Sequence, residues 1–350
     1  MPALLRAYLF LATGVHYVAI QAHTFVYLPS PPILARCCLF GLDLLMPLAF
    51  LFPFSCIAIW AGNGIVSKLA VGVLSPAALA WSRWVVAALV LSPFLARRVW
   101  RARARLRAGL WQIAMLASLG MVLNQTFGYY AAQTLGATEM GLMMGLTPLL
   151  TVLFSIWLLR ERPTWGAVLG ALLSILGLSI LLGQGDPTRL FTQGIHIGSV
   201  YMLISAGTYA LYSVLLKKWD LGLDNWSLLY GQVICSVVIL TPFFLLVDGQ
   251  WPDGRALWLI LYAGIPTSAL SPWLWMQGIA LLGANRTAIF MNLLPVMTAG
   301  LAITLLGERL TSYHLIGGGL TLLGVLLAQL LVRPVVMGRR RVVLAPCPEE

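Results

Sequence analysis

The chain contains one stretch twice: LGATEMGLMMGLTPLLTVLFSIWLLRERPTWGAVLGALLSILGLSILL runs from Leu135 to Leu182, and LGANRTAIFMNLLPVMTAGLAITLLGERLTSYHLIGGGLTLLGVLLAQ runs from Leu282 to Gln329. The copies align without a gap, and about a third of their positions are identical. Leucine-rich helices match easily by chance, but prolines, Glu-Arg pairs and glycines at fixed spacing do not. The matched positions are Pro148 and Pro295, Glu161-Arg162 and Glu308-Arg309, Gly170 and Gly317, and Gly177 and Gly324. The chain is therefore built from an internal repeat.

The composition is typical of a polytopic membrane protein. Hydrophobic residues make up 60% and charged residues 9%, whereas soluble domains carry about 25% charged residues. The formal net charge is +11, but the basic residues cluster at the ends of apolar runs, which argues against nucleic-acid binding. The five cysteines are scattered without disulfide or metal-ligand spacing, which favours free thiols. We expect neither a metal site nor a cofactor.

Ten apolar runs of about 20 residues are each long enough to cross the hydrocarbon core. Continuous runs of this kind favour helices, because a helix satisfies its own backbone hydrogen bonds in lipid. We therefore predict an all-α integral membrane protein. Its helices are expected at residues 48–69, 76–96, 109–130, 137–158, 164–182, 197–216, 226–247, 256–278, 285–306 and 312–332.

Residues 1–45 differ from the rest of the chain. The apolar run Tyr8–Leu28 carries two histidines and ends in a proline-rich turn. It has three interpretations: a poor signal peptide, an extra membrane segment, or sequence upstream of a true start at Met46. We favour the third, a mis-assigned start, because Met46-Pro47 opens a clean first helix.

The basic residues orient the bundle. One set of alternate loops, including Arg97–Arg107, is rich in arginine and lysine, and the other set is nearly devoid of them. The rich side and both termini are therefore predicted to be cytoplasmic. Five helices per copy is an odd number, so the second copy enters the membrane upside down. The predicted inverted repeats are residues 46–183 and 197–332, joined by a linker at 184–196 and followed by a basic tail at 333–350. Inverted repeats can exchange inward- and outward-open states around one midplane site.

Six short segments carry a further signal: WAGNGIVSK at 60–68, WSRWVVAA at 81–88, NQTFGYY at 124–130, GAT at 136–138, TP at 147–148 and RERP at 160–163. They resemble the motifs of helices one to four in the EamA family of the drug/metabolite transporter superfamily. The resemblance covers about residues 48–332. It implies ten helices in two inverted five-helix repeats, a central cavity, and passage of small polar metabolites, often outward. It does not name the substrate.

Arg83 is the sharpest candidate for function. Polar side chains at membrane depth are costly and usually face the bundle interior, and Arg83 lies about 12 Å below the outer surface at a rise of about 1.5 Å per residue. One interpretation is that it holds a substrate carboxylate or phosphate as a fixed cation. The other is that it caps carbonyls between packed helices. Its counterpart in the second repeat, Gln232, is neutral, which favours anionic or zwitterionic substrates over cations.

Amides and aromatic rings complete the predicted substrate site. An amide beside a ring suits a small amphipathic solute. The alternative is that the amides join helices and the rings line the membrane interface. Together with Arg83, the predicted substrate-binding residues are Trp60, Asn63, Asn124, Gln125, Tyr129, Tyr212, Trp275, Gln277 and Asn292.

Glu139 and two prolines are candidates for coupling and gating. Glu139 is the only carboxylate within a predicted span and could carry a coupling proton. The alternative is a charge that complements the dipole of a helix N-terminus. Pro148 and Pro295 fall about mid-helix at equivalent positions, where proline bends a helix. These kinks either gate the cavity or are static.

The main functional prediction is a secondary transporter of small polar metabolites in the plasma or inner membrane, working outward by alternating access. No nucleotide-binding G-x-x-x-x-G-K-[ST] loop is present. A membrane-embedded lipid-modifying enzyme would need a catalytic cluster, and no catalytic residues are predicted. A non-transporting scaffold or sensor is the other alternative, and it would need no polar cavity. The expected partners are a small-molecule substrate and membrane lipids, with anionic lipid at Arg97–Arg107, and the chain is expected to be a monomer or homodimer.

Overall fold

The computed structural model describes residues 33–189, 194–219, 221–247, 254, 256–282, 287 and 290–331, with the backbone alone for residues 33–48. All regular structure in these ranges is helical. Eight helical segments are long and apolar enough to cross a membrane, and Phe290–Leu306 is a shorter apolar helix. The third predicted span, at residues 109–130, corresponds to the helical residues 110–132, which are divided into three shorter segments. The predicted all-α membrane fold is confirmed, while predictions for residues 1–32 and for the tail after residue 331 lie outside the described residues.

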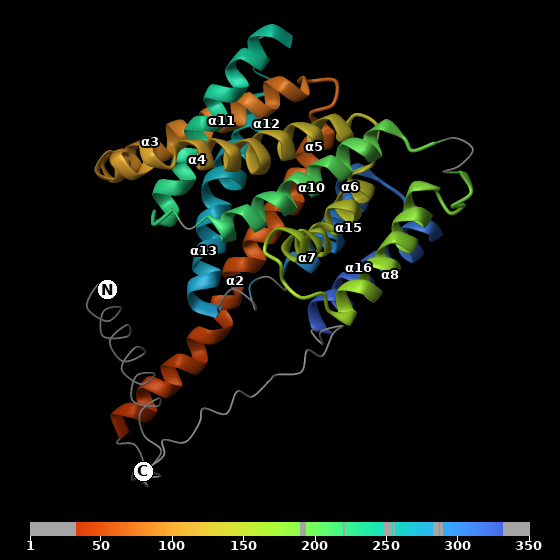
Figure 1. Cartoon of the computed structure of the whole chain (residues 1–350), viewed down its shortest axis with the longest axis horizontal. Helices are drawn as coiled ribbons and strands as arrows, with labels where there is room; N and C mark the ends of the chain where they lie inside the picture. Colours follow the sequence, from red (N-terminus) through yellow and green to blue (C-terminus); the bar gives the residue numbers. More distant parts are fainter. Residues whose placement is uncertain are drawn as a thin grey trace, which may run out of the picture. The chain divides into compact units, whose positions relative to one another are not determined.

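The helices follow the two repeats in order (Figure 1). The first helix begins earlier than the predicted residue 48, and several predicted spans are divided into shorter segments. The first repeat contains α2 (Ile33–Leu69), α3 (Pro76–Ala108), α4 (Leu110–Ala117), the π-helical η1 (Ser118–Leu123), α5 (Asn124–Ala132), α6 (Ala137–Met144), α7 (Thr147–Leu158) and α8 (Trp165–Leu182). The second contains α10 (Ile197–Lys218), α11 (Asn225–Val247), α12 (Leu257–Tyr262), the π-helical η2 (Ala263–Leu270), α13 (Ser271–Leu282), η3 (Phe290–Asn292), α15 (Leu293–Leu306) and α16 (Ser312–Leu330).

Capping residues set several of the helix starts. The Ser75 hydroxyl accepts a hydrogen bond from Ala78 N at 3.0 Å, and Pro76 occupies the first helical position of α3, where no amide proton is needed. The aligned threonines Thr164 and Thr311 precede α8 and α16 in the same way. These capping residues determine where the apolar helices begin.

Equivalent helices of the two repeats pack against each other, and they run antiparallel. The indole of Trp81 on α3 donates to the Thr241 hydroxyl on α11 at 3.0 Å. The aligned pair, Tyr230 on α11 and Ser92 on α3, joins the same helices by a 2.7 Å hydrogen bond between hydroxyls. The beginning of each helix therefore meets the later part of the other. This is the packing that an inverted repeat requires.

Helices α8 and α16 lie side by side (Figure 1), and glycines form their contact. A Cβ added at Gly177 would lie 2.5 Å from the carbonyl oxygen of Gly317, and one added at Gly317 would lie 2.7 Å from that of Gly177. Gly170 and Gly324 meet in the same way further along the pair. Small residues allow such close backbone approach in membranes. Close backbone contacts at the aligned glycines therefore pair the last helices of the two repeats.

The repeat extends to the backbone conformation at the helix ends. Arg160 after α7 has φ 55°, and its counterpart Gly307 after α15 has φ 67°. In the next position, Glu161 N donates to Ser155 O at 3.4 Å, and Glu308 N donates to Ala302 O at 3.2 Å. Both helices therefore end in a left-handed residue followed by an acid whose own amide caps the helix.

Pro148 and Pro295, which were predicted to lie in the middle of their helices, lie in the first turn of α7 and of α15. The fourth predicted span is interrupted after Met144, and α7 restarts with Pro148 in its first turn. Pro295 is likewise the third residue of α15, directly after η3. Proline is tolerated in a first turn because its missing amide proton would have no helical partner there. The structure therefore shows helix breaks before both prolines, in place of kinks centred on them.

Candidate functional site

A cavity of about 700 Å³ lies between the repeats and is lined by both of them. Eight of the predicted substrate-binding residues line it: Trp60, Asn63, Arg83, Asn124, Gln125, Tyr129, Tyr212 and Trp275. The other two do not. Asn292 instead donates to the Gln329 side chain on α16 at 3.0 Å, and Gln277 lies on α13 outside the cavity lining.

Arg83 is 1% exposed, and its side-chain hydrogen bonds within the described residues all go to neutral groups. Its Nε and one terminal nitrogen donate to the Ser268 hydroxyl at 3.0 and 2.8 Å. The other terminal nitrogen donates to Gln125 Oε1 at 2.6 Å and to the Tyr129 hydroxyl at 2.5 Å. The guanidinium also lies 5.0 Å from the ring centroid of Trp84. The predicted alternative, capping of backbone carbonyls, is not the arrangement observed among these contacts.

The two π-helical segments occupy equivalent places in the two repeats, and the second one positions Ser268. The Ser268 hydroxyl donates to Ala263 O at 2.7 Å, five residues earlier, as the wider turn allows. Gly264 in the same segment lets α3 come close, since a Cβ there would lie 3.1 Å from Arg83 O. π-Helical turns are rare and often mark functional sites.

Asn124 and Gln125 extend the Arg83 network toward α10. Gln125 Nε2 donates to Asn124 Oδ1 at 2.8 Å, and Asn124 Nδ2 donates to Ser205 O at 2.9 Å and to its hydroxyl at 3.1 Å. The Ser205 hydroxyl in turn donates to Asn124 O at 2.7 Å. Asn124 therefore joins α5 to α10, and its two side-chain atoms are already engaged within the protein.

Aromatic rings line the cavity from both repeats. Trp60 and Trp275 have ring centroids 5.6 Å apart, and Tyr209 and Tyr212 have theirs 5.6 Å apart. Gly120 in η1 makes room for the second tyrosine, because a Cβ there would lie 2.6 Å from the Tyr212 ring. Rings beside amides give the mixed apolar and polar wall that small-molecule sites commonly have.

The charge of the cavity is positive. Its charged side chains among the described residues are Arg83 and Lys217, and no described acid lines it. Both residues Asn63 and Gln232 line the cavity, and their buried acceptors Asn63 Oδ1 and Gln232 Oε1 have no hydrogen-bond partner in the part of the chain that the structure describes. The site therefore offers one buried cation together with unsatisfied oxygen acceptors.

The cavity reaches different surroundings at its two ends. At one end its lining includes Lys217 and Asn225, which are exposed; we call this the Lys217 end. Toward the opposite end, which we call the Lys68 end, the lining stops at the buried residues Ser67, Met140 and Thr298. The cavity is thus open at the Lys217 end and closed at the Lys68 end.

Glu139 lies away from this cavity. It is in the first turn of α6 and lines a second cavity of about 230 Å³. Its Oε1 is 3.7 Å from Nε2 of His314 on α16, and His314 Nδ1 accepts from Thr311 N at 3.2 Å. The position in the first turn fits the dipole-complementing interpretation.

Sequence reasoning missed several cavity residues. Ser268 and Ser205 hold Arg83 and Asn124 but are two among many serines in apolar runs. The nearby glycines Gly264 and Gly128 could have drawn attention to these positions, but glycine is common throughout the chain and does not single them out.

Comparison with known proteins agrees with this architecture. The family model described as "EamA-like transporter family" matches residues 46–183 and again 196–330. An uncharacterized transporter of Bacillus subtilis strain 168, YyaM, is 27% identical over 274 residues, which cover 77% of this chain and 89% of the relative. A probable terminal-alkyne amino-acid exporter of Streptantibioticus cattleyicolor is 24% identical over 291 residues, or 82% of this chain and 94% of the exporter.

A solved crystal structure has the same fold. It is 21% identical and superposes with a TM-score of 0.57, over 81% of this chain and 97% of the other. The family model covers most of the chain and matches it once in each repeat. The chain is thus a multi-pass membrane protein that belongs to the EamA-like transporter family.

Proposed function

We propose that the chain exports small metabolites with an anionic group, amino-acid-like solutes above all, by alternating access across the plasma or inner membrane. The observation that carries the proposal is the environment of Arg83. A buried guanidinium lines the cavity, its hydrogen bonds go to neutral groups, and no described acid lines the cavity with it. A substrate carboxylate would supply the missing negative charge.

The rest of the cavity supports a zwitterionic solute. The unpartnered oxygens of Asn63 and Gln232 are acceptors that suit an ammonium group. Pockets for small molecules usually measure about 300–1,000 Å³, and this cavity measures about 700 Å³. The rings of Trp60 and Trp275 offer an apolar surface for the remainder of the solute.

The open end of the cavity supports outward transport. The arginine- and lysine-rich loops, to which Lys217 belongs, favour a cytoplasmic position for the Lys217 end and for both termini. A cavity open at this end takes up solute from the cytoplasm. The Streptantibioticus relative is itself named a probable terminal-alkyne amino-acid exporter.

Mass spectrometry of culture medium and cell extract tests the proposal. Cells that over-express the chain are compared with cells expressing Gly128→Trp at equal membrane levels. A Cβ at Gly128 meets only Ser205 Oγ, at 3.6 Å, so a large ring there fills the cavity. We expect one or more small carboxylate-bearing metabolites to rise in the medium with the parent chain and to stay at background with the variant.

Gly207→Trp is the matched control. Gly207 lies on α10 outside the cavity lining, and no atom is within 4 Å of its Cβ position. This variant should export as the parent does. Identical metabolite profiles for parent, Gly128→Trp and empty cells would contradict export and favour a scaffold or sensor.

A further inference from the structure

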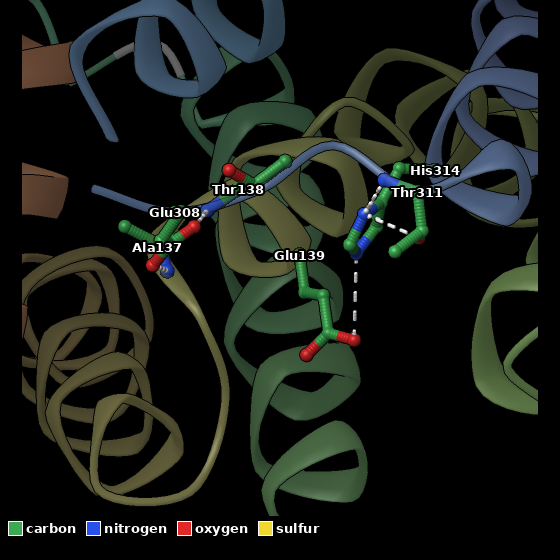
Figure 2. Close-up of polar contacts among 6 residues, drawn as sticks. All are labelled: Ala137, Thr138, Glu139, Glu308, Thr311 and His314. Carbon is green, nitrogen blue, oxygen red and sulfur yellow. Dashed lines mark hydrogen bonds and ion pairs between the residues drawn. The ribbon is translucent and has the colours of Figure 1, made fainter. Parts of the chain in front are cut away.

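Beyond the closed end of the cavity, a carboxylate of the second repeat binds the start of a helix of the first repeat. Glu308, which follows α15, accepts hydrogen bonds from Ala137 N at 2.7 Å and from Thr138 N at 3.0 Å (Figure 2). These are the first two amides of α6, and they have no acceptor within their own helix. One carboxylate therefore satisfies two backbone donors and complements the dipole of the helix that begins there.

Lys68 completes the same contact from α2. Its Nζ donates to Ala132 O at 3.0 Å and to Leu135 O at 2.8 Å. These carbonyls lie at the end of α5 and in the short connection to α6. The α5–α6 connection is thus held on its carbonyl side by Lys68 and on its amide side by Glu308.

Gly136 is required for the close approach of Glu308. A Cβ at this position would lie 3.2–3.3 Å from the carboxylate atoms. Burial alone would raise the pKa of Glu308. The hydrogen bonds from Thr138 and Ala137 and the charge of Lys68 outweigh that effect, so its pKa lies below the ordinary value and the group is charged at neutral pH.

The repeat places the same two residue types at the open end, where they make a different contact. Glu161 and Lys217 are the counterparts of Glu308 and Lys68. They form a 2.9 Å ion pair with side chains 47% and 67% exposed. An exposed ion pair of this kind contributes little to stability. The backbone geometry at the two helix ends is similar, but Glu308 binds two backbone amides at the closed end while Glu161 forms an exposed ion pair at the open end.

We propose that Glu308 and Lys68 form a latch that holds the Lys68 end closed, and that this latch must release before the cavity can open there. The inference rests on the proposed alternating access and names the residues that control one of its two states. Lys68 directly follows the cavity residue Ser67, and the Ala137 amide that Glu308 binds lies about one helical turn before the cavity residue Met140. Lys68 and Glu308 are not themselves in the cavity lining, so the latch can act on access without touching the solute. Glu308 is therefore a gating residue.

Cysteine labelling tests the latch, and the repeat supplies a matched pair of reporters. Ser67 and its counterpart Leu216 both line the cavity, each one residue before its lysine. Each is replaced by cysteine in a chain whose five native cysteines are replaced. A membrane-impermeant maleimide is applied to right-side-out vesicles for the Ser67→Cys reporter, and to inside-out vesicles for the Leu216→Cys reporter.

Glu308→Ala should make the Ser67→Cys reporter react at least about tenfold faster, because losing two charge-assisted hydrogen bonds shifts the population toward the open state. The Leu216→Cys reporter should react more slowly in the same variant. Glu161→Ala is the matched control, and it should leave the rate at Ser67→Cys unchanged. Glu308→Gln keeps the size of the side chain and gives the same test if Glu308→Ala does not fold.

Three outcomes overturn the latch: an unchanged rate at Ser67→Cys in both folded Glu308 variants, an equal increase with Glu161→Ala, or an increase at both reporters together, which indicates general loosening. The parent chain is assayed for metabolite export in parallel. Export without the labelling shift contradicts the latch but agrees with the proposed function. A labelling shift without export supports the latch and contradicts the proposed function.

Discussion

Replacing Arg83 with glutamine is expected to lower the export of carboxylate-bearing solutes about 100-fold, since charged hydrogen bonds contribute about 1.5–3 kcal/mol each and about 1.4 kcal/mol changes a constant tenfold. Glutamine is the residue at the aligned position 232, so both sides of the cavity would then be neutral. The measurement is the initial rate of efflux from loaded vesicles containing equal amounts of purified parent or variant.

Two further variants separate charge from geometry. Arg83→Lys keeps the charge but loses the planar fork that reaches Ser268, Gln125 and Tyr129 together, so an intermediate rate is expected. Lys217→Gln removes the second described cation of the cavity lining. Because Lys217 is exposed and already paired with Glu161, this variant should transport at close to the parent rate. Full activity of a well-folded Arg83→Gln protein would show that Arg83 is a structural residue.

Gly177→Val is expected to prevent the accumulation of folded protein. A Cβ at Gly177 would lie 2.5 Å from Gly317 O and 2.6 Å from Thr321 N. Both are backbone atoms of a helix, so neither can rotate away, and α8 and α16 would have to separate along their length. The measurement is the height of the monodisperse peak in size-exclusion chromatography and the midpoint of thermal unfolding.

Gly319→Val is the control for this prediction. Gly319 lies on α16 with no atom within 4 Å of its Cβ position, so valine there carries the same helix-propensity cost without a clash. Its elution and unfolding midpoint should remain close to those of the parent. Equal behaviour of the two variants would mean that the glycine contact is not what holds the last helices together.

The sequence predicted the architecture because two of its signals are local and strong. Apolar runs long enough to cross a bilayer must form helices there. Matched glycines in the last helix of each repeat allow these two helices to pack closely against each other. The structure pairs α8 with α16 through these glycines. Arg83, Gln125 and Tyr129 were also predicted as a group, and the structure brings them within hydrogen-bond distance.

The details of the cavity depended on non-local geometry. Which face of a helix meets the cavity is decided by packing, and Gln277 and Asn292 were assigned to the cavity from their polarity alone. The π-helical segments η1 and η2 have no sequence marker that distinguishes them from ordinary α-helix. Pro148 was placed mid-helix because the apolar run continues through it, and the break before it is visible only in the backbone.

The antiparallel pairing of α3 with α11 and of α8 with α16 has a consequence for how the chain is built. Most close helix contacts, including those of α5 with α10 and of α6 with α15, join one half of the chain to the other. Neither half is a domain in the usual sense, because each buries its inner surfaces on its counterpart. The protein is in effect an obligate heterodimer of its own two halves, joined into one polypeptide.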